Sequence, residues 1–365
     1  MVEMAAHMTA AVLHGREDLR IEQVPMPIAG PGEIVVRVHA ALTCGTDLKV
    51  YRRGYHARML KPPIPFGHEL AGTVHEAGKG VSAFRKGDRV VALNSAPCGE
   101  CYYCRHDQEN LCDNLLFNNG AYAEYLHIPA RIVARNTLRI PTGIPFEHAA
   151  LTEALACVVR GLDECQPRTG APGASGFGAT GWSKGDTIAV IGGGPIGLMF
   201  MHVAELYGLR VIAVVKRDEQ IAAARTFGAS EVVQITAVPD PIAAVRALTP
   251  HSRGVDIAVE AVATPLAWQW AVDMVRKGGT VNFFGGCAAG TKVELDTNRL
   301  HYNNITLRSS FHHTPQAARK AFDLIVSGRF RCSDTITSRA PLSDLNRVFR
   351  RLMNRAGDIK TAIIP

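Results

Sequence analysis

Four of the chain's nine cysteines lie close together, and thiolates so spaced bind metal ions. Two residues separate Cys98 from Cys101 and Cys101 from Cys104, and Cys112 follows eight positions after Cys104. Four thiolates from one short segment can close a tetrahedron around zinc, which leaves no open coordination position. The alternatives are an iron–sulfur cluster or four unrelated cysteines. Taken with the rest of the chain, the pattern predicts a structural zinc lobe over about residues 94–115.

A second set of metal-binding side chains is spread over three distant segments. Cys44 stands in Cys-Gly-Thr-Asp, His68 in Gly-His-Glu, and Glu153 before an apolar stretch that predicts a helix. Singly, they have ordinary interpretations as a small buried residue, a core histidine and a carboxylate at a helix start. Together, a thiolate, an imidazole and a carboxylate can hold zinc with a fourth position open to water or substrate. This set therefore predicts a catalytic metal site.

A glycine-rich turn follows an apolar strand at Ala189-Val-Ile-Gly192-Gly-Gly194-Pro-Ile-Gly197. Glycines also make ordinary turns, but here a helical stretch and a second strand at 210–215 follow in the order that dinucleotide binding requires. The first glycine permits a tight turn, the second lets a pyrophosphate approach the backbone, and the third allows helix and strand to pack closely. The predicted coenzyme contacts from this turn are Gly192, Gly194, Pro195, Ile196 and Gly197.

The second strand of this motif ends without the carboxylate that bonds the adenosine ribose, expected about 20 positions past the first glycine. It reads Val214-Val215-Lys216-Arg217 instead. A guanidinium can pair with a 2′-phosphate through two hydrogen bonds, whereas a carboxylate would repel it. Lys216 and Arg217 therefore predict a preference for NADP(H) over NAD(H). The alternatives are that both side chains point to solvent or that Asp218 reaches the ribose.

The elements that must position these residues change character along the chain. Short or alternating apolar runs between Gly and Pro turns fill the first third and predict a small β-rich domain. From about Gly185, apolar strands alternate with helical segments, which predicts an α/β fold with a doubly wound parallel sheet. Further strands are expected there at 232–234, 255–260, 279–284 and 305–308, with a helix over 265–276.

Two other segments have a distinct character. After about Phe311 the chain offers a helix over 315–327 and a closing strand over 360–364, too little for a separate domain. This segment is expected to return to the first domain. The Gly, Ala, Ser and Thr-rich stretch over 166–184 shows no periodicity and predicts a flexible loop before the parallel sheet.

Composition excludes several classes of protein. Apolar residues make up 47% and charged residues 20%, the profile of a globular protein rather than a disordered one. The sequence contains no apolar run long enough for a membrane span, and its first residues lack a secretory signal pattern. We therefore expect a cytoplasmic protein that does not enter a membrane. The net charge of +7 is scattered, which favours a solvated surface over a nucleic-acid partner.

In this order and spacing, these elements resemble the zinc-dependent medium-chain alcohol dehydrogenase superfamily. The resemblance covers nearly the whole chain and rests on Gly67-His-Glu69, the four-cysteine lobe, Gly120-Ala-Tyr-Ala-Glu-Tyr125 and the glycine turn. The Cys-Gly-Thr-Asp start and Glu153 are more similar to the polyol (sorbitol) and threonine dehydrogenase branch than to the simple-alcohol enzymes. The resemblance implies a GroES-like catalytic domain (1–160 and 312–365), a Rossmann domain (161–311) and a homodimer or homotetramer.

Position by position, the resemblance implies that Cys44, His68 and Glu153 bind the catalytic zinc. Glu69 would lie beside the ion and either bind it directly or exchange with water. Asp47 would orient His68, a role that metal-bound imidazoles generally need filled. An ion so held lowers the pKa of a bound alcohol, which then releases hydride to the nicotinamide ring. With the cysteine lobe, the chain would carry two zinc ions.

Three further positions are assigned to catalysis or substrate binding. Thr46 would relay the proton that leaves the alcohol, and Lys49 stands where many relatives have a histidine at the end of that relay. A lysine carries a proton in this way only if its pKa is lowered, and the alternative is a solvated side chain. Asn94 falls where simple-alcohol enzymes often have an aromatic wall, and an amide there would suit a substrate with several hydroxyl or amino groups.

The predicted function is hydride transfer between NAD(P), with NADP favoured, and a secondary alcohol such as a polyol, sugar alcohol, aminocyclitol or hydroxy amino acid. The first alternative is an NAD-dependent simple-alcohol dehydrogenase or aldehyde reductase. A second keeps the fold without the reaction, as a zincless quinone reductase or a binding relative. A third, a zinc-ribbon protein that binds nucleic acid, leaves the glycine turn and Gly67-His-Glu69 unexplained.

Overall fold

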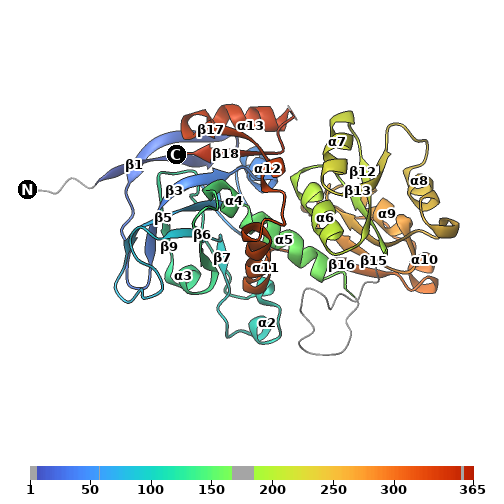
Figure 1. Ribbon diagram of the computed structural model, residues 1–365, viewed down its shortest axis with the longest axis horizontal. Helices are drawn as coiled ribbons and strands as arrows, with labels where there is room; N and C mark the ends of the chain where they lie inside the picture. The colour runs from blue at the N-terminus through green and yellow to red at the C-terminus, as the bar shows by residue number, and fades with distance from the viewer. Residues whose placement is uncertain (1–5, 57, 167–184, 355–356) are drawn as a thin grey trace, which may run out of the picture. The chain divides into compact units, whose positions relative to one another are not determined.

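The computed structural model describes residues 6–56, 58–166, 185–354 and 357–365. The chain forms two compact units (Figure 1): unit 1 contains Met1–Ala156 and His313–Pro365, and unit 2 contains Cys157–His312. The sequence predicts boundaries after residues 160 and 311, and the structure has them after 156 and 312. The Gly-rich loop expected over 166–184 lies, beyond residue 166, outside the described residues.

Unit 1 is built mainly from antiparallel strands joined by Gly and Pro turns. Its largest sheet has the order β10-β6-β5-β3-β18-β17, and β9 also pairs with β3. A hairpin of β1 and β2 is extended by β4 into a second sheet, and β7 pairs with β8. The strands are β1 (His7–Gly15), β2 (Asp18–Pro25), β3 (Ile34–Leu42), β4 (Ile64–Pro65), β5 (Leu70–Ala77), β6 (Arg89–Ala92), β7 (Ser95–Ala96), β8 (Leu116–Phe117), β9 (Tyr125–Ile128), β10 (Thr137–Arg139), β17 (Ile336–Pro341) and β18 (Lys360–Ile364).

Short helices connect and cover these strands. Each begins where the chain leaves a strand or a turn, and α5 runs in sequence from unit 1 into unit 2. The helices are α1 (Gly45–Arg53), α2 (Tyr102–Arg105), α3 (Ala130–Asn136), α4 (Phe146–Ala150), α5 (Thr152–Asp163), α11 (Pro315–Val326), α12 (Cys332–Thr335) and α13 (Leu345–Met353), with 3-10 turns η1 (Glu109–Leu111) and η3 (Leu342–Asp344).

The C-terminal segment completes the sheet of unit 1. β18 pairs antiparallel with β3, and β17 pairs parallel with β18. In α13, the fully buried Phe349 ring makes edge-to-face contacts with Tyr51, Phe66 and Tyr122. Such aromatic contacts stabilise a core beyond the area that they bury. The last part of the chain is therefore part of the core of unit 1.

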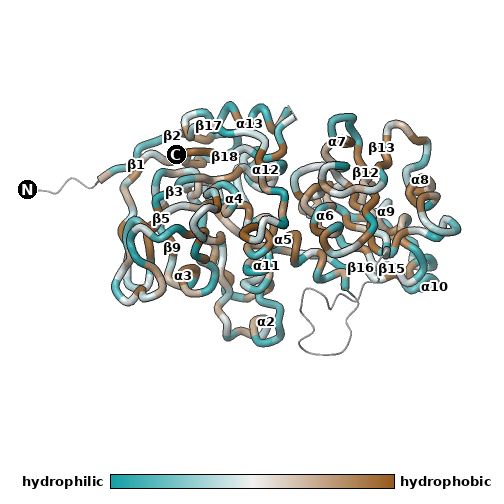
Figure 2. The backbone as a smooth tube through the Cα atoms, in the orientation of Figure 1, coloured by the Kyte–Doolittle hydropathy of each residue, from teal (hydrophilic) through white to brown (hydrophobic). Residues whose placement is uncertain are grey.

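Unit 2 is a parallel sheet with the order β13-β12-β11-β14-β15-β16 among the described residues. Counted along the unit this order is 3-2-1-4-5-6, the order of a doubly wound dinucleotide-binding sheet, which confirms the predicted fold class. Figure 2 shows α6 as largely hydrophobic, whereas α7 and α10 are more hydrophilic. The elements are β11 (Thr187–Ile191), α6 (Pro195–Leu206), β12 (Arg210–Val215), α7 (Asp218–Thr226), β13 (Ala229–Gln234), α8 (Pro241–Ala247), η2 (Pro250–Ser252), β14 (Val255–Glu260), α9 (Pro265–Met274), β15 (Val275–Phe283), α10 (Thr297–Tyr302) and β16 (Thr306–Ser309).

The structure also differs from the sequence-based expectations in the bounds of some elements and in the C-terminal segment. The helix expected over 265–276 ends at Met274, because Val275 is extended (φ −76°, ψ 151°) and begins β15. The elements β17 and α13 are not anticipated, since the arginines of α13 obscure its short apolar stripe. Within the described ranges, every helix is too short or too polar to cross a bilayer.

Replacing Phe349 by alanine should destabilise unit 1, because a cavity would open among three aromatic rings. We expect the free energy of unfolding, measured by urea denaturation, to fall by about 3–5 kcal/mol. Tyr302→Ala is the control, since that side chain is 75% exposed, and its effect should stay within about 0.5 kcal/mol. Equal losses in the two variants would contradict a core role for the C-terminal segment.

Candidate functional site

Helix α1 begins at the residues that the sequence assigns to a metal site. Cys44 is its N-cap, and the Cys44 Sγ accepts a hydrogen bond from the Thr46 amide at 3.5 Å. Asp47 lies in the first turn and is buried, Thr46 is half-buried, and Lys49 is exposed. The partial positive charge at the start of the helix favours negative charge on the Cys44 sulfur and on Asp47.

His68 lies just before β5 and is oriented by Asp47. Its Nδ1 lies 2.8 Å from Asp47 Oδ1, so Nδ1–H donates to the carboxylate and Nε2 is left for another partner. Burial lowers the pKa of His68, but the Asp47 carboxylate and the Cys44 thiol outweigh burial and raise this pKa well above its ordinary value. A positive charge at Nε2, whether a proton or a metal ion, is therefore favoured here.

Asp47 is itself held by Tyr122, which was not among the predicted site residues. The Tyr122 hydroxyl lies 2.6 Å from Asp47 Oδ2, to which it donates, and 3.0 Å from the Leu42 carbonyl. Gly67 makes this possible, because its φ is +91° and a Cβ there would lie 2.6 Å from the Tyr122 ring. Burial and the Asp47 charge raise the pKa of Tyr122 well above its ordinary value, so the hydroxyl keeps its proton. His68, Asp47 and Tyr122 form one buried hydrogen-bonded chain.

Glu153, in the first turn of α5, lies beside His68. Its Oε2 is 3.9 Å from His68 Nε2, and burial raises the pKa of Glu153 to about 7. Ligand atoms bound at about 2.0–2.3 Å to one tetrahedral zinc are separated by roughly 3–4 Å. Ligand atoms of Cys44, His68 and Glu69 also lie within 4.8 Å of one another. The donors present fit a zinc ion.

Glu69 stands beside these residues, but Lys360 occupies both of its oxygens. Lys360 Nζ lies 2.7 Å from Glu69 Oε1 and 2.6 Å from Oε2, and it donates to the Thr43 carbonyl at 2.8 Å. Lys360 is 1% exposed and Glu69 is fully buried. Burial lowers the pKa of Lys360, but the Glu69 charge outweighs it and raises this pKa, so the ion pair stays charged. Glu69 must break charge-assisted bonds before it can bind a metal.

His313 joins this neighbourhood from far along the chain. Its Nε2 lies 3.1 Å from Asn94 Oδ1 and 3.9 Å from Glu153 Oε1. The His313 and Asn94 side chains are both buried. Asn94, which is expected to line a substrate pocket, is therefore linked to Glu153 through the His313 ring, whose Nε2 faces both side chains.

The four cysteines of the predicted lobe come together, with their Sγ atoms all within 4.8 Å of one another. Backbone amides point at the sulfurs, and those of Glu100 and Cys101 donate to Cys98 Sγ at 3.5 and 3.4 Å. These bonds lower the pKa of Cys98 to about 6, which favours the thiolate form that binds metals. Four sulfurs in this arrangement fit a structural zinc, with no position left for a substrate.

In unit 2, the glycine turn lies between β11 and α6. Gly192 has φ +119°, and a Cβ at Gly197 would lie 1.9 Å from the Gly192 carbonyl oxygen. Both positions therefore require glycine for the close approach of helix and turn. Gly194 is the N-cap of α6, which continues with Pro195 and Ile196. Backbone amides at a helix start of this kind can bind a phosphate group.

The turn after β12 carries the two cations expected to face the coenzyme. Gln220 Oε1 accepts hydrogen bonds from the Lys216 and Arg217 amides at 3.1 and 3.0 Å, which fixes the turn. Lys216 is exposed, and the Arg217 guanidinium pairs with the exposed Glu219. The Asp218 carboxylate accepts a hydrogen bond from a side chain of β13 at 2.5 Å. To reach a ribose, Asp218 would have to leave that partner.

Tyr122, His313 and Lys360 contact the predicted site residues but were missed by reasoning from the sequence. For each of them the sequence offered only a weak indication of a role in the site. Tyr122 lies in Gly-Ala-Tyr-Ala-Glu-Tyr, and His313 precedes a Thr-Pro helix start. Lys360 is a charged residue at the start of an apolar strand. Spacing could not identify them, because each contacts residues far away in the chain.

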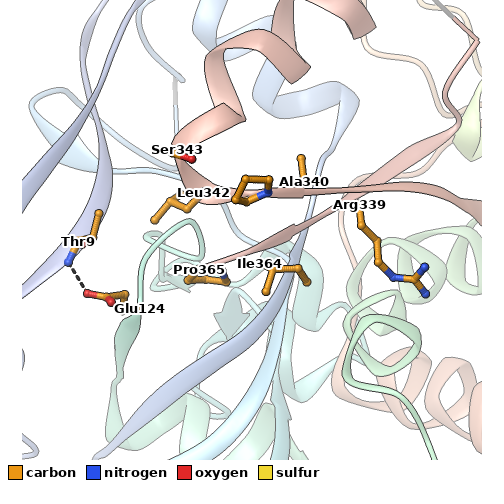
Figure 3. Close-up of a pocket in the computed structure, with 9 residues that line it drawn as sticks. Thr9, Glu124, Arg339, Ala340, Leu342, Ser343, Ile364 and Pro365 are labelled. Carbon is orange, nitrogen blue, oxygen red and sulfur yellow. Dashed lines mark hydrogen bonds between the residues drawn. The ribbon is translucent and has the colours of Figure 1, made fainter.

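Unit 1 also contains a groove of about 570 Å³ near the C-terminal strand (Figure 3). Thr9, Glu124, Arg339 and Ile364 are among its lining residues, and the Thr9 amide donates to Glu124 at 2.6 Å. None of the lining residues belongs to the sets around Cys44 or Cys98. The groove is therefore separate from the candidate site.

Comparisons with known proteins agree with the fold. Residues 30–141 match the alcohol dehydrogenase GroES-like domain, and residues 195–327 match the zinc-binding dehydrogenase domain. The L-threonine 3-dehydrogenase of Bacillus subtilis is 30% identical, over 94% of each chain. The sorbitol dehydrogenase of the same species is 27% identical, over 98% of each chain.

A solved structure gives the same result. The structure of a protein described as a zinc-binding dehydrogenase, from Sinorhizobium meliloti and bound to NADP, superposes with a TM-score of 0.86 at 28% identity. The match covers 99% of this chain and 100% of that one. The fold and the two donor sets define a zinc-dependent oxidoreductase. The chain belongs to the zinc-binding alcohol dehydrogenase superfamily, which confirms the resemblance seen in the sequence.

Tyr122→Phe should weaken metal binding at the site around Cys44 without unfolding unit 1. The change removes the hydroxyl that holds Asp47, and loss of such a partner lowers metal affinity by about 10–100-fold. Chelator competition on zinc-loaded protein measures this, and a Cys44→Ser variant identifies which ion is affected. Tyr51→Phe, in the same aromatic cluster, is the control. Unchanged zinc affinity in Tyr122→Phe would refute the role given to the hydroxyl.

Proposed function

We propose that this protein transfers hydride between a secondary alcohol bearing further hydroxyl or amino groups and a nicotinamide dinucleotide, with NADP(H) preferred. The observation that carries the proposal is the gathering of metal-binding side chains from distant segments: ligand atoms of Cys44, His68 and Glu69 lie within 4.8 Å of one another, and Glu153 Oε2 lies 3.9 Å from His68 Nε2. Threonine and sorbitol, which give two relatives their names, are both alcohols of this kind. The NADP bound to a structural relative further supports the coenzyme.

We assign the catalytic metal site to Cys44, His68 and Glu153, with Glu69 outside it at rest. The salt bridge between Glu69 and Lys360 supports this assignment, because both oxygens of that carboxylate are already neutralised. Breaking a buried ion pair costs about 3–5 kcal/mol, which Glu69 would have to recover by binding the metal. Glu153 lies beside His68 instead, with its Oε2 3.9 Å from His68 Nε2, which supports Glu153 as the third ligand.

The residues around this site have separate tasks in the proposed reaction. Bound zinc would lower the pKa of the alcohol, and bound NADP would accept the hydride. The Thr46 hydroxyl would relay the proton that the alcohol releases, whereas the exposed position of Lys49 supports a solvated side chain rather than a place in that relay. Asp47 would keep its bonds to His68 and Tyr122 throughout, so that the imidazole holds its orientation.

We further propose that Cys98, Cys101, Cys104 and Cys112 bind the second, structural zinc. All nine cysteines are free of disulfides, which supports a reducing compartment such as the cytoplasm. The resemblance to the family supports a homodimer or homotetramer. Size-exclusion chromatography with light scattering tests the oligomeric state, and a monomer would contradict it.

Metal content and activity together test the proposed function. Wild-type protein should hold two zinc ions per chain, and Glu153→Ala should hold one, because a ligand is lost at the site around Cys44. Its kcat/KM should fall at least about 100-fold, as expected when an electrostatic stabiliser is lost. Elemental analysis gives the metal content. Activity is followed by absorbance of the reduced nicotinamide with a panel of polyols, amino alcohols and aldehydes.

Glu69→Gln is the matched control, since an amide still accepts a hydrogen bond from Lys360. It should retain two zinc ions. One ion in Glu69→Gln and two in Glu153→Ala would reverse the assignment of the ligands. No hydride transfer by zinc-loaded wild type with any compound and either coenzyme would refute the function itself.

The coenzyme preference depends on Arg217 and its neighbour Glu219. Arg217→Asp should lower the NADP to NAD ratio of kcat/KM by about 10–100-fold, because a charged hydrogen-bond partner of the 2′-phosphate is lost. Glu219→Gln should raise the same ratio, because it frees the guanidinium from a competing carboxylate. Arg225→Asp, an equal charge change at an exposed position of α7, is the control. Equal ratios in all four proteins would contradict the assignment.

A further inference from the structure

Asn94 combines deep burial with an unused hydrogen-bond donor. It lies between β6 and β7, is 3% exposed, and its carbonyl accepts from the Asn118 amide at 2.7 Å. Its side-chain Oδ1 lies 3.1 Å from His313 Nε2. Its Nδ2 has no hydrogen-bond partner in the described part of the chain. Buried amide donors in native proteins nearly always have an acceptor, so this Nδ2 requires an explanation.

His313 fixes which end of this amide is used. The ring is 2% exposed and comes directly before Thr314, the N-cap whose hydroxyl accepts from the Ala317 amide at 3.2 Å. With Oδ1 of Asn94 as the acceptor, the ring donates from Nε2, and the amide can turn its Nδ2 toward the ring only if the ring changes to its other tautomer. The Nδ2 hydrogens therefore stay available to a ligand. Because His313 Nε2 is also 3.9 Å from Glu153 Oε1, the pair adjoins the proposed zinc site.

The chemistry of an amide N–H limits what can complete this site. A donor in a buried position is satisfied by an oxygen lone pair, as in a hydroxyl group. An ammonium group offers donors and no acceptor, so it would leave Nδ2 unsatisfied and face the Nδ2 hydrogens directly. A hydrocarbon would leave the donor unsatisfied as well, which is unfavourable in a buried site.

We propose that the Asn94–His313 pair selects substrates with a hydroxyl on the carbon next to the reacting carbinol. The substrate class is then the vicinal diol of a polyol or sugar alcohol, in preference to a vicinal amino alcohol or a plain secondary alcohol. This inference rests on the proposed function and narrows it. Asn94 binds the second hydroxyl, and His313 is a positioning residue that acts through Asn94.

Three matched four-carbon alcohols test this selection in the wild-type holoenzyme. Butane-2,3-diol, 3-aminobutan-2-ol and butan-2-ol share the reacting carbinol and differ at the neighbouring carbon. We expect kcat/KM to be highest for the diol, by at least about tenfold over each of the other two, because a site built to bond a hydroxyl rejects analogues that lack it.

Substitutions at Asn94 then test the assignment to this residue. Asn94→Asp replaces the donor by a carboxylate of the same size and should raise the ratio of amino alcohol to diol by about tenfold or more. Asn94→Leu should bring the ratio of diol to butan-2-ol close to one. The same changes at Asn298, an exposed position of α10, are the controls and should leave both ratios as in wild type.

Substitutions at His313 separate positioning from general structural damage. Gln can still donate to Asn94 Oδ1, so His313→Gln should keep most of the diol preference, whereas His313→Leu should lose it. A wild-type enzyme that oxidises all three compounds with similar kcat/KM would overturn this inference and leave the proposed function standing. So would ratios that Asn94→Asp does not change. If none of the three compounds, and no compound of the wider panel, is oxidised with either coenzyme, both proposals fail.

Discussion

The ion pair between Lys360 and Glu69 is the constraint on which the arrangement of unit 1 depends. Two opposite charges are removed from water entirely, and removing either partner alone would leave a buried charge at a cost of about 3–5 kcal/mol. The pair joins the last strand to the loops that carry Thr43 and His68. It also neutralises the Glu69 carboxylate, so the donors left around the proposed metal site are those of Cys44, His68 and Glu153.

A second buried carboxylate, that of Asp47, is bonded to an imidazole and a hydroxyl and not to a lysine such as Lys360. Asp47 does not face a cation of its own but shares its oxygens between His68 and Tyr122. Its charge therefore acts through the imidazole, where it favours a positive partner at Nε2. Gly67 has a left-handed backbone conformation and no Cβ, so the Tyr122 ring can lie against it. The glycine required by the backbone therefore directly precedes His68, on which the Asp47 charge acts. The two buried carboxylates thus differ in their partners and in their effect on the site.

The fold could be predicted from the sequence because strand order and turn chemistry leave local marks. The glycine turn and the alternation of strands and helices indicated the doubly wound sheet, and its order is confirmed. The donors of both metal sites could be proposed because few residue types bind zinc. The structure brings Cys44 and His68 together and places Glu153 beside His68, although their role in binding zinc stays a prediction. Lys360, His313 and Tyr122 could not be found in this way. Their significance comes from contacts across the sheet, which no local pattern records.

The two donor sets differ in how much of the chain they need. The cysteine lobe is complete within fifteen residues, from Cys98 to Cys112, so it can close around an ion while the rest of the polypeptide is still on the ribosome. The other set draws on segments far apart in the chain and needs Lys360, which begins β18, in place against Glu69. During translation the lobe can therefore capture its ion early, whereas the other set stays incomplete until β18 has been synthesised. In such an order the four cysteines of the lobe can bind zinc before the set around Cys44 is complete, so the two sets do not compete for the same ion.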